Sequence, residues 1–261
     1  MCRETHYVWM YLVAYYKSCP FTACPLEEKI LYDPKFMSPV VTGDECWVYG
    51  YDPETKQMSS QWNMASSPRP KKARQVNSSV RSTLGAFFDI DGLVHHEYIS
   101  RGQKVNNEYY KRVLQCLLDA VLRHRPEKWR SGNWNLQYDN APAHRAVTTN
   151  GFLAKHNTLS LPHPPYSPDH APCNFFLFPQ LKETSKRRRF DYVEGIQANA
   201  TRQLRAITES DYPRCFRQWQ EHWNKCIQAQ WHYFEGDKTN QPVSLFIHSQ
   251  NLVPELNDQP T

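Results

Sequence analysis

A short apolar strand that ends in an acid constrains this chain most. Residues 134–138 read Trp-Asn-Leu-Gln-Tyr, which favours a strand, and Asp139 follows at its end. Ligands of open α/β sheets bind in crevices at the carboxyl ends of strands, so Asp139 is a candidate site residue. By residue type alone, an aspartate at a strand end is more often a turn or cap residue. The segment therefore favours an α/β domain and leaves both roles open for Asp139.

A proline-rich segment, residues 163–178, follows this strand. It reads His-Pro-Pro-Tyr-Ser-Pro-Asp-His-Ala-Pro-Cys-Asn-Phe-Phe-Leu-Phe. We expect a turn that leads into a helix from about His170 to Lys186. Asp169 is placed to cap this helix and Pro172 to occupy its first turn.

The remaining elements are predicted from periodicity. Asp91-Gly92 lies between two β-type runs, 80–90 and 93–99, and is a strong hairpin signal; we give Asp89 and Asp91 little weight as metal ligands. A helix begins near Asn107, because its apolar residues share one face: Tyr110, Val113, Leu114, Leu117 and Val121. Further elements are strands at 44–51, 60–64 and 243–247, a buried strand at 159–161, and helices near 146–156, 193–207 and 211–227. This order suggests a mixed sheet with helices on both faces.

The composition permits an anionic partner without requiring one. The net charge is +5, and the basic residues form two clusters without acids. A solvated face is the common explanation for such clusters, and DNA contact is the alternative. The candidate DNA-binding residues are Arg69, Lys71, Lys72 and Arg74 of the first cluster and Lys186, Arg187, Arg188 and Arg189 of the second. The eight cysteines form no C-x-x-C pair, which favours a reducing compartment, and no apolar run reaches the length of a membrane span.

Three motifs resemble the catalytic core of mariner-type transposases, the Tc1/mariner group. They are Thr-Gly-Asp-Glu-Cys-Trp at 42–47, Asp-Asn-Ala-x-x-His at 139–144 and the proline-rich segment at 163–178. The resemblance covers residues 33–237 and implies an RNase H-like fold for this catalytic domain. It also implies that Asp44, Asp139 and a third residue bind Mg²⁺ or Mn²⁺ for DNA cleavage and strand transfer. We expect His144 and His163 to be structural, each satisfying a backbone group or lining the cleft.

The third position holds asparagine where the family has aspartate. Asn174 follows Asp139 with the 34 residues 140–173 between them, which is the mariner spacing. A family branch fused to a SET domain also carries asparagine there. An amide oxygen can ligate a metal but brings no charge, so the ligand set falls from −3 to −2. The resemblance therefore implies a catalytic triad of Asp44, Asp139 and Asn174 that is incomplete, and whether the chain is an enzyme is uncertain.

The resemblance also carries expectations about partners and domains. Residues 1–32 are expected to be a divergent segment and residues 238–261 a loose tail. The family's paired helix-turn-helix units do not fit within residues 1–30, so we expect weak sequence preference on DNA. DNA in the nucleus is the expected partner, a homodimer is a further expectation, and no membrane contact is expected. The leading hypothesis is a degenerate DNA-processing domain. The alternatives are a non-catalytic DNA-binding or dimerisation module derived from a transposase, and a product with no selected role.

Overall fold

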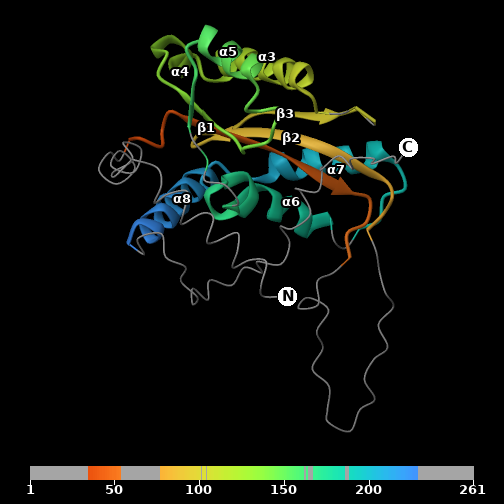
Figure 1. Cartoon of the computed structure of the whole chain (residues 1–261). Helices are drawn as coiled ribbons and strands as arrows, with labels where there is room; N and C mark the ends of the chain where they lie inside the picture. The colour runs from red at the N-terminus through yellow and green to blue at the C-terminus, as the bar shows by residue number, and fades with distance from the viewer. Residues whose placement is uncertain are drawn as a thin grey trace, which may run out of the picture.

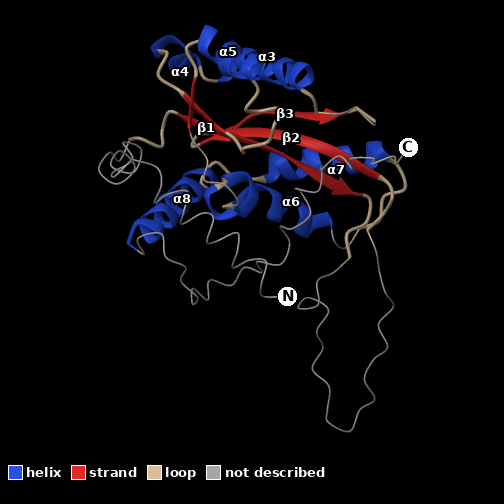
Figure 2. Cartoon of the chain, in the orientation of Figure 1, coloured by secondary structure: helices blue, strands red, loops and turns tan. Residues whose placement is uncertain are grey.

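The chain folds around a five-stranded mixed sheet (Figures 1 and 2). The computed structural model describes residues 35–53, 77–100, 102–103, 105–161, 163, 167–185 and 188–228. The strands lie in the order β3-β2-β1-β4-β5. Their bounds are β1 Val40–Tyr49, β2 Arg81–Asp89, β3 Gly92–Ile99, β4 Asn135–Gln137 and β5 Leu159–Leu161. The strand β2 is antiparallel to both β1 and β3, whereas β4 is parallel to both β1 and β5.

Helices cover both faces of this sheet (Figure 1). One layer holds α3 Asn107–His124, α4 Pro126–Ser131 and α5 Val147–Lys155. The other holds α6 Phe178–Ser185, α7 Val193–Ala206 and α8 Asp211–Gln228. This arrangement confirms the predicted α/β fold with helices on both faces. No helix in the described part of the chain has an apolar stretch long enough to cross a lipid bilayer.

Local sequence signals explain the β2–β3 hairpin and α3. Gly92 has a φ of 131°, a conformation that favours glycine at this turn. The side chain of Asn106 accepts a hydrogen bond from the backbone N–H of Tyr109 at 2.9 Å and so caps the start of α3. The predicted apolar stripe of α3, from Tyr110 to Val121, is buried against the sheet. Both predicted elements are therefore confirmed.

Alternate residues of β1 belong to two hydrophobic cores, one on each face of the sheet. Val40 and Val48 belong to the core beneath α6, α7 and α8, where the helices contribute residues such as Phe216. Val41 belongs to the core beneath α3, which also holds Leu117. Neighbouring residues of a strand point to opposite faces, so each position of β1 is assigned to one core by its parity. Positions 44 and 45 therefore face opposite helix layers.

The proline-rich segment differs from the predicted helix. A 3₁₀ turn at Pro168–His170 and a π-helical turn at Cys173–Leu177, labelled η1 and η2, precede α6. No side-chain hydrogen bond caps either turn, so the predicted capping role of Asp169 is wrong. Asp169 is exposed, and its backbone carbonyl instead accepts a hydrogen bond from Nδ1 of His222 at 2.7 Å. The segment is held by α8 rather than by its own cap.

Two further expectations about elements need correction. The strand at 159–161 forms as predicted, but it is an edge strand, and Leu159 is 69% exposed rather than buried. The short helix α4 was not predicted. The strands expected at 60–64 and 243–247 lie outside the described residues.

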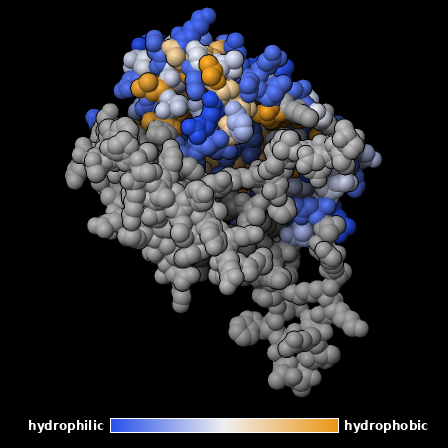
Figure 3. All heavy atoms as spheres, viewed as in Figure 1, coloured by the Kyte–Doolittle hydropathy of each residue, from blue (hydrophilic) through white to orange (hydrophobic). Residues whose placement is uncertain are grey.

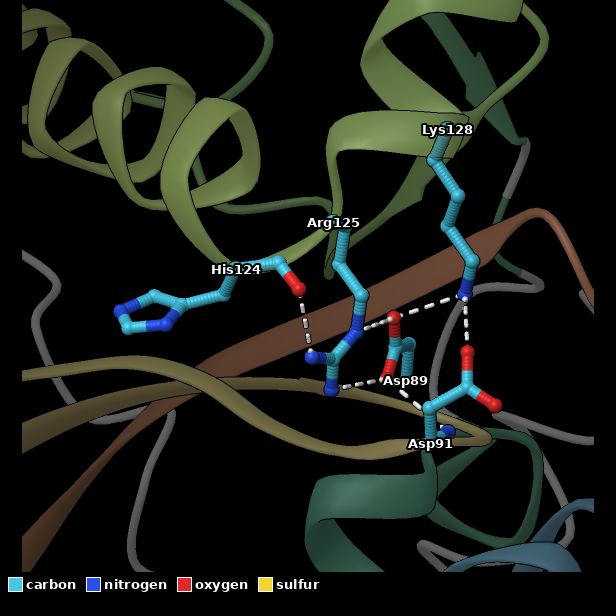
Figure 4. A network of polar contacts seen from close by, with 5 residues as sticks. All are labelled: Asp89, Asp91, His124, Arg125 and Lys128. Atoms are coloured by element: carbon cyan, nitrogen blue, oxygen red, sulfur yellow. Dashed lines mark hydrogen bonds and ion pairs between the residues drawn. The ribbon is translucent and has the colours of Figure 1, made fainter.

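A buried ionic network ties the β2–β3 hairpin to α3 and α4 (Figure 4). The Asp89 side chain is 0% exposed and accepts two hydrogen bonds from Arg125, from Nε at 2.8 Å and Nη2 at 2.9 Å. Nζ of Lys128 also donates to Asp89 at 2.7 Å and lies 3.2 Å from Asp91. Two cations therefore compensate one fully buried carboxylate, as a buried charge requires. Asp89 thus stabilises the fold through ion pairs, which agrees with the little weight given to it as a metal ligand.

We expect Asp89→Asn to destabilise the fold by about 3 kcal/mol, because removing one partner leaves Arg125 and Lys128 poorly compensated. Urea-induced unfolding of the purified chain measures this loss. Glu127→Gln is the matched control, since Glu127 pairs only with Arg130 on the surface. An equal unfolding midpoint for Asp89→Asn and the wild-type chain would contradict the role of the network.

Candidate active site

The parallel pairing of β1 and β4 places Asp44 and Asp139 at one end of the sheet. Thr42 lies opposite Gln137 in this register, and each aspartate follows two residues further along its chain segment. Because side chains repeat their direction every two residues, Asp44 shares a face of β1 with Thr42. The Thr42 hydroxyl donates a hydrogen bond to Oε1 of Gln137, which joins the two segments just before the acids.

Three acidic side chains, Asp44, Glu45 and Asp139, lie close enough at this end of the sheet to affect one another. The pKa of Asp44 is raised well above its ordinary value, first by burial and then by the charges of Asp139 and Glu45. Burial and the charge of Asp139 also raise the pKa of Glu45, although His144 acts against them. Carboxylates that repel one another in a buried setting favour a bound cation. Carboxylate oxygens are also the ligands that Mg²⁺ and Mn²⁺ prefer.

Asn174 lies in the π-helical turn η2, on the same side of the sheet as Asp44. Its neighbour Cys173 is fully buried and has its Sγ 3.9 Å from the carbonyl oxygen of Ala86. Ala86 is the partner of Asp44 in the β1–β2 register, and the charge of Asp44 contributes to raising the pKa of Cys173. The structure therefore places all three predicted positions in one region. π-Helical turns are rare in proteins, and those that occur are often found at functional sites.

His144 contacts the acids directly. Its Nδ1 is 2.6 Å from Oδ1 of Asp139, and its Nε2 is 3.5 Å from Oε2 of Glu45. Burial disfavours the charged imidazolium, but the hydrogen bond with Asp139 and the nearby carboxylates outweigh it and raise the pKa of His144 to about 9. The same interactions lower the pKa of Asp139 despite its burial. His144 thus positions Asp139, and the expectation that it satisfies a backbone group is corrected.

A turn delivers His144 to this place. Oδ1 of Asp139 accepts a hydrogen bond from the backbone N–H of Ala141 at 3.0 Å, and the N–H of His144 donates to the Ala141 carbonyl at 2.9 Å. Aspartate side chains commonly fold the following residues back in this way. The spacing Asp-x-x-x-x-His after a strand end was the sequence signal for this pair.

His163 supports the end of β4. Nε2 of Gln137 lies 3.1 Å from its Nδ1, and Nδ2 of Asn140 donates to its carbonyl oxygen at 2.7 Å. Burial lowers the pKa of His163 to about 4, so the ring is neutral and its Nδ1 accepts from the amide. His163 is structural and lies beside the acids, as predicted. The role of Asn140 in holding it was missed by sequence reasoning.

The donor set predicted from the sequence is two carboxylates and one amide oxygen. Within the described ranges, no group of three or more histidine, cysteine, aspartate and glutamate side chains is arranged to hold a metal ion. Asp44, Asp139 and Asn174 together offer hard oxygen donors, which suit Mg²⁺ or Mn²⁺. The residues therefore fit such an ion with one negative charge fewer than three aspartates would supply.

Three chain segments that are far apart in the sequence meet just after the carboxyl end of β1. The N–H of Gly50 donates to the Val80 carbonyl and the N–H of Phe190 donates to the Gly50 carbonyl, both at 2.8 Å. Arg81 follows Val80 and Arg189 precedes Phe190, so basic residues of distant segments flank this junction. A Cβ on Gly50 would lie 2.4 Å from the Phe190 carbonyl oxygen, which explains the glycine at this position.

Exposed arginines at this junction lie on aromatic rings. The guanidinium of Arg81 is 4.1 Å from the ring centroid of Trp47, and that of Arg189 is 4.4 Å from that of Tyr51. Arg188 is exposed and contacts Asn199 through Nη1 at 3.3 Å. The remaining predicted DNA-binding residues lie outside the described residues: Arg69, Lys71, Lys72, Arg74, Lys186 and Arg187.

The fold and the site define a class of protein. A mixed sheet with an antiparallel hairpin next to parallel strands, helices on both faces, an acid within β1 and another just after β4 is an RNase H-like domain. A family model described as "Transposase (partial DDE domain)" matches residues 52–131. The class is therefore that of DDE-type transposases.

Comparisons with known proteins identify the family. The Mariner Mos1 transposase of Drosophila mauritiana is 30% identical over 201 residues, 77% of this chain and 57% of the relative. Human histone-lysine N-methyltransferase SETMAR is 27% identical over 209 residues, 78% of this chain and 29% of the relative. The chain thus spans little more than half of the first relative and under a third of the second.

Solved structures of the Mos1 transposase also resemble the fold of this chain. The Mos1 mariner paired end complex with Mn matches with a TM-score of 0.70 and 28% identity, over 87% of this chain and 61% of that chain. The Mos1 catalytic domain with Raltegravir and Mg matches with a TM-score of 0.63 and 26% identity, over 87% and 93%. Together with the family model, they show that the chain carries a mariner-family transposase catalytic domain.

Gly43, the residue before Asp44, lies close to the ring of Phe87. Gly43 faces Phe87 across the β1–β2 pair, and a Cβ at position 43 would lie 2.0 Å from the Phe87 ring. We expect Gly43→Ala to destabilise the fold by about 1–3 kcal/mol through overpacking. Phe87→Leu in the same chain should recover part of that loss by vacating the space. Urea unfolding of both single variants and the double variant measures the coupling, and strictly additive losses would contradict the contact.

Proposed function

We propose that this chain is a transposon-derived DNA-processing domain whose metal-dependent cleavage of DNA strands is weakened. The observation that carries the proposal is the juxtaposition of Asp44 and Asp139 at one end of the sheet with Asn174 in the neighbouring π-helical turn. The mariner relatives support DNA as the substrate, and the proposed place of action is the nucleus.

The proposed chemistry assigns a role to each side chain. Asp44, Asp139 and the amide oxygen of Asn174 would hold Mg²⁺ or Mn²⁺, the ions named for the Mos1 structures. Such an ion neutralises phosphate charge and lowers the pKa of a bound water or 3′-hydroxyl. His144 keeps Asp139 ionised and oriented, which maintains it as a ligand. With asparagine at position 174, the site offers one negative charge fewer, which weakens cation binding.

A second candidate is a non-catalytic DNA-binding or dimerisation module. It is favoured by the same asparagine, together with the exposed Arg81 and Arg189 that flank the junction at Gly50. Cationic side chains can contact DNA phosphates whether or not the carboxylate site binds metal. The two candidates differ in one property, which is cleavage of DNA in the presence of a divalent ion.

We expect Asn174→Asp to increase nicking of supercoiled plasmid in Mn²⁺ by about tenfold or more, because tenfold requires only about 1.4 kcal/mol of transition-state stabilisation. The substitution restores a carboxylate in nearly the same shape. Agarose gels of plasmid over time give the rates for the wild-type chain and the variant. The gain should disappear when EDTA removes the metal.

Two controls make this experiment decisive. Asp44→Ala and Asp139→Ala, each placed in the Asn174→Asp chain, should abolish nicking if all three residues share one site. A folded, DNA-binding Asn174→Asp chain that fails to nick in Mn²⁺ would refute the enzyme candidate and leave the binding module. Nicking that survives Asp44→Ala would indicate a contaminating nuclease.

We expect duplex DNA binding to weaken steeply with salt, with a log–log slope of about −0.9 for each phosphate contacted. Arg188→Gln with Arg189→Gln should make that slope less negative by up to about 1.8, since two cations are removed. Arg205→Gln with Arg217→Gln removes the same charge from exposed positions of α7 and α8 and serves as the control. Fluorescence anisotropy across a salt series measures both, and a flat salt dependence would contradict phosphate contact.

We also propose a homodimer, which the paired end complexes of Mos1 support. Light scattering across a wide concentration range should give a mass near twice the 30.8 kDa of the chain. A mass that stays near 30.8 kDa throughout would contradict this part of the proposal.

A further inference from the structure

A groove of about 500 Å³ lies between α3 and α5, on the outer surface of their layer. It is lined by Lys111 of α3, by Thr148, Gly151, Phe152 and Lys155 of α5, and by His156 just after α5, among others. Figure 3 shows that this part of the molecule has a mainly hydrophilic surface with scattered hydrophobic groups. Neither the active site nor the basic junction at Gly50 includes any of these residues.

The groove has a cationic rim and an aromatic floor. Lys111 and Lys155 are exposed, and no acidic side chain is among the described residues that line the groove. The centroid of the Phe152 ring lies 5.8 Å from Nζ of Lys111. The centroid of the His156 ring lies 4.7 Å from that of Phe152. This combination suits a ligand that has both anionic groups and flat rings.

Gly151 keeps the groove open. A Cβ at this position would meet no atom within 4 Å, so the missing side chain relieves no clash. Glycine is a poor residue for a helix interior, where it destabilises relative to alanine. Its presence in α5 has no packing explanation, and the space above it belongs to the groove.

Two contacts connect the helices that form the groove to the turn that carries His144. Lys111 follows Tyr110, whose ring centroid lies 3.9 Å from that of His144, the partner of Asp139. The Thr149 hydroxyl donates to the Ala143 carbonyl at 2.8 Å and so fixes the start of α5 to the turn that carries His144. The helices that form the groove therefore also position His144, the partner of Asp139.

The width and volume of the groove favour a single strand of nucleic acid over a duplex. Packed helices lie about 8–10 Å apart, which leaves a groove too narrow to admit a DNA duplex. Its volume falls in the range of about 300–1,000 Å³ that holds a small ligand. Positive grooves with aromatic floors bind single strands, because phosphates contact the cations and bases stack on the rings.

We propose that the α3–α5 groove binds a segment of single-stranded DNA. Its phosphates contact Lys111 and Lys155, and a base packs against Phe152 and His156. This inference rests on the proposed function, since it takes DNA as the substrate of the acids. The groove gives a separated strand a place of its own while duplex DNA is held elsewhere.

The test compares single-stranded and duplex DNA on the full chain. Fluorescence anisotropy with a labelled ten-nucleotide oligothymidylate should show about tenfold weaker binding by the Lys111→Gln/Lys155→Gln chain at low salt. The salt slope should become less negative by about 1.4, since each phosphate on a single strand contributes about 0.7. A labelled hairpin duplex should bind both chains equally. Gly151→Glu should reproduce the single-strand loss by charge repulsion, whereas Gly151→Ala should not.

Controls separate this inference from its alternatives. Arg205→Gln with Arg217→Gln removes equal charge elsewhere and should leave oligothymidylate binding unchanged. Equal losses for single strand and duplex, or a loss as large in the control chain, would overturn the groove as a single-strand site. Displacement of the oligonucleotide from Lys111 and Lys155 by poly-glutamate at equal charge concentration would overturn it in favour of an acidic peptide.

Chemical modification tests the same groove without substitutions. Acetylation of the native chain followed by mass spectrometry should show that oligothymidylate protects Lys111 and Lys155 but not Lys182 of α6. Unprotected Lys111 and Lys155 under saturating oligothymidylate would refute the groove. If the unmodified native chain binds duplex DNA although Lys111 and Lys155 stay unprotected, the groove inference fails and the proposed function survives. If the unmodified native chain does not bind duplex DNA, the proposed function itself fails.

Discussion

The parallel register between β1 and β4 is the constraint on which the candidate site depends. Thr42 and Gln137 lie side by side and share a buried hydrogen bond, so the two chain segments reach the same end of the sheet in phase. A shift by one residue would reverse every side chain of β4 relative to β1. Asp44 and Asp139 would then face opposite helix layers, and neither could share a ligand with the other. His163 strengthens this register from the far side of Gln137.

Charge balance at that end follows from burial. Asp44, Glu45 and Asp139 repel one another, and each is at least partly removed from water. His144 sits between Glu45 and Asp139, and its positive charge offsets part of the repulsion. Asp44 points to the opposite face of β1 from Glu45, and its side chain accepts a hydrogen bond from the N–H of Glu45. Asp44 is therefore the carboxylate whose charge most needs a cation.

Much of the fold could be predicted because its signals are local. Asp91-Gly92 determines a hairpin within a few residues, and the α3 stripe is read from one helical period. Features that depend on distant partners could not be predicted. Asp89 was given little weight as a metal ligand, but its structural role depends on Arg125 and Lys128, 36 and 39 residues away. The three site positions came from motif resemblance, whereas the contact of His144 with two carboxylates required the folded turn.

The π-helical turn explains how the fold can persist while the charge at its centre changes. Cys173, Phe176 and Leu177 anchor this turn in the core beneath α8, and the N–H of Asn174 donates to the Ala171 carbonyl. None of these interactions uses the side chain at position 174. Asparagine and aspartate are therefore interchangeable for folding but not for binding a divalent ion, to which only aspartate brings a charge. Similarity of fold to an active relative consequently carries little information about cleavage, which depends on electrostatics at a single position.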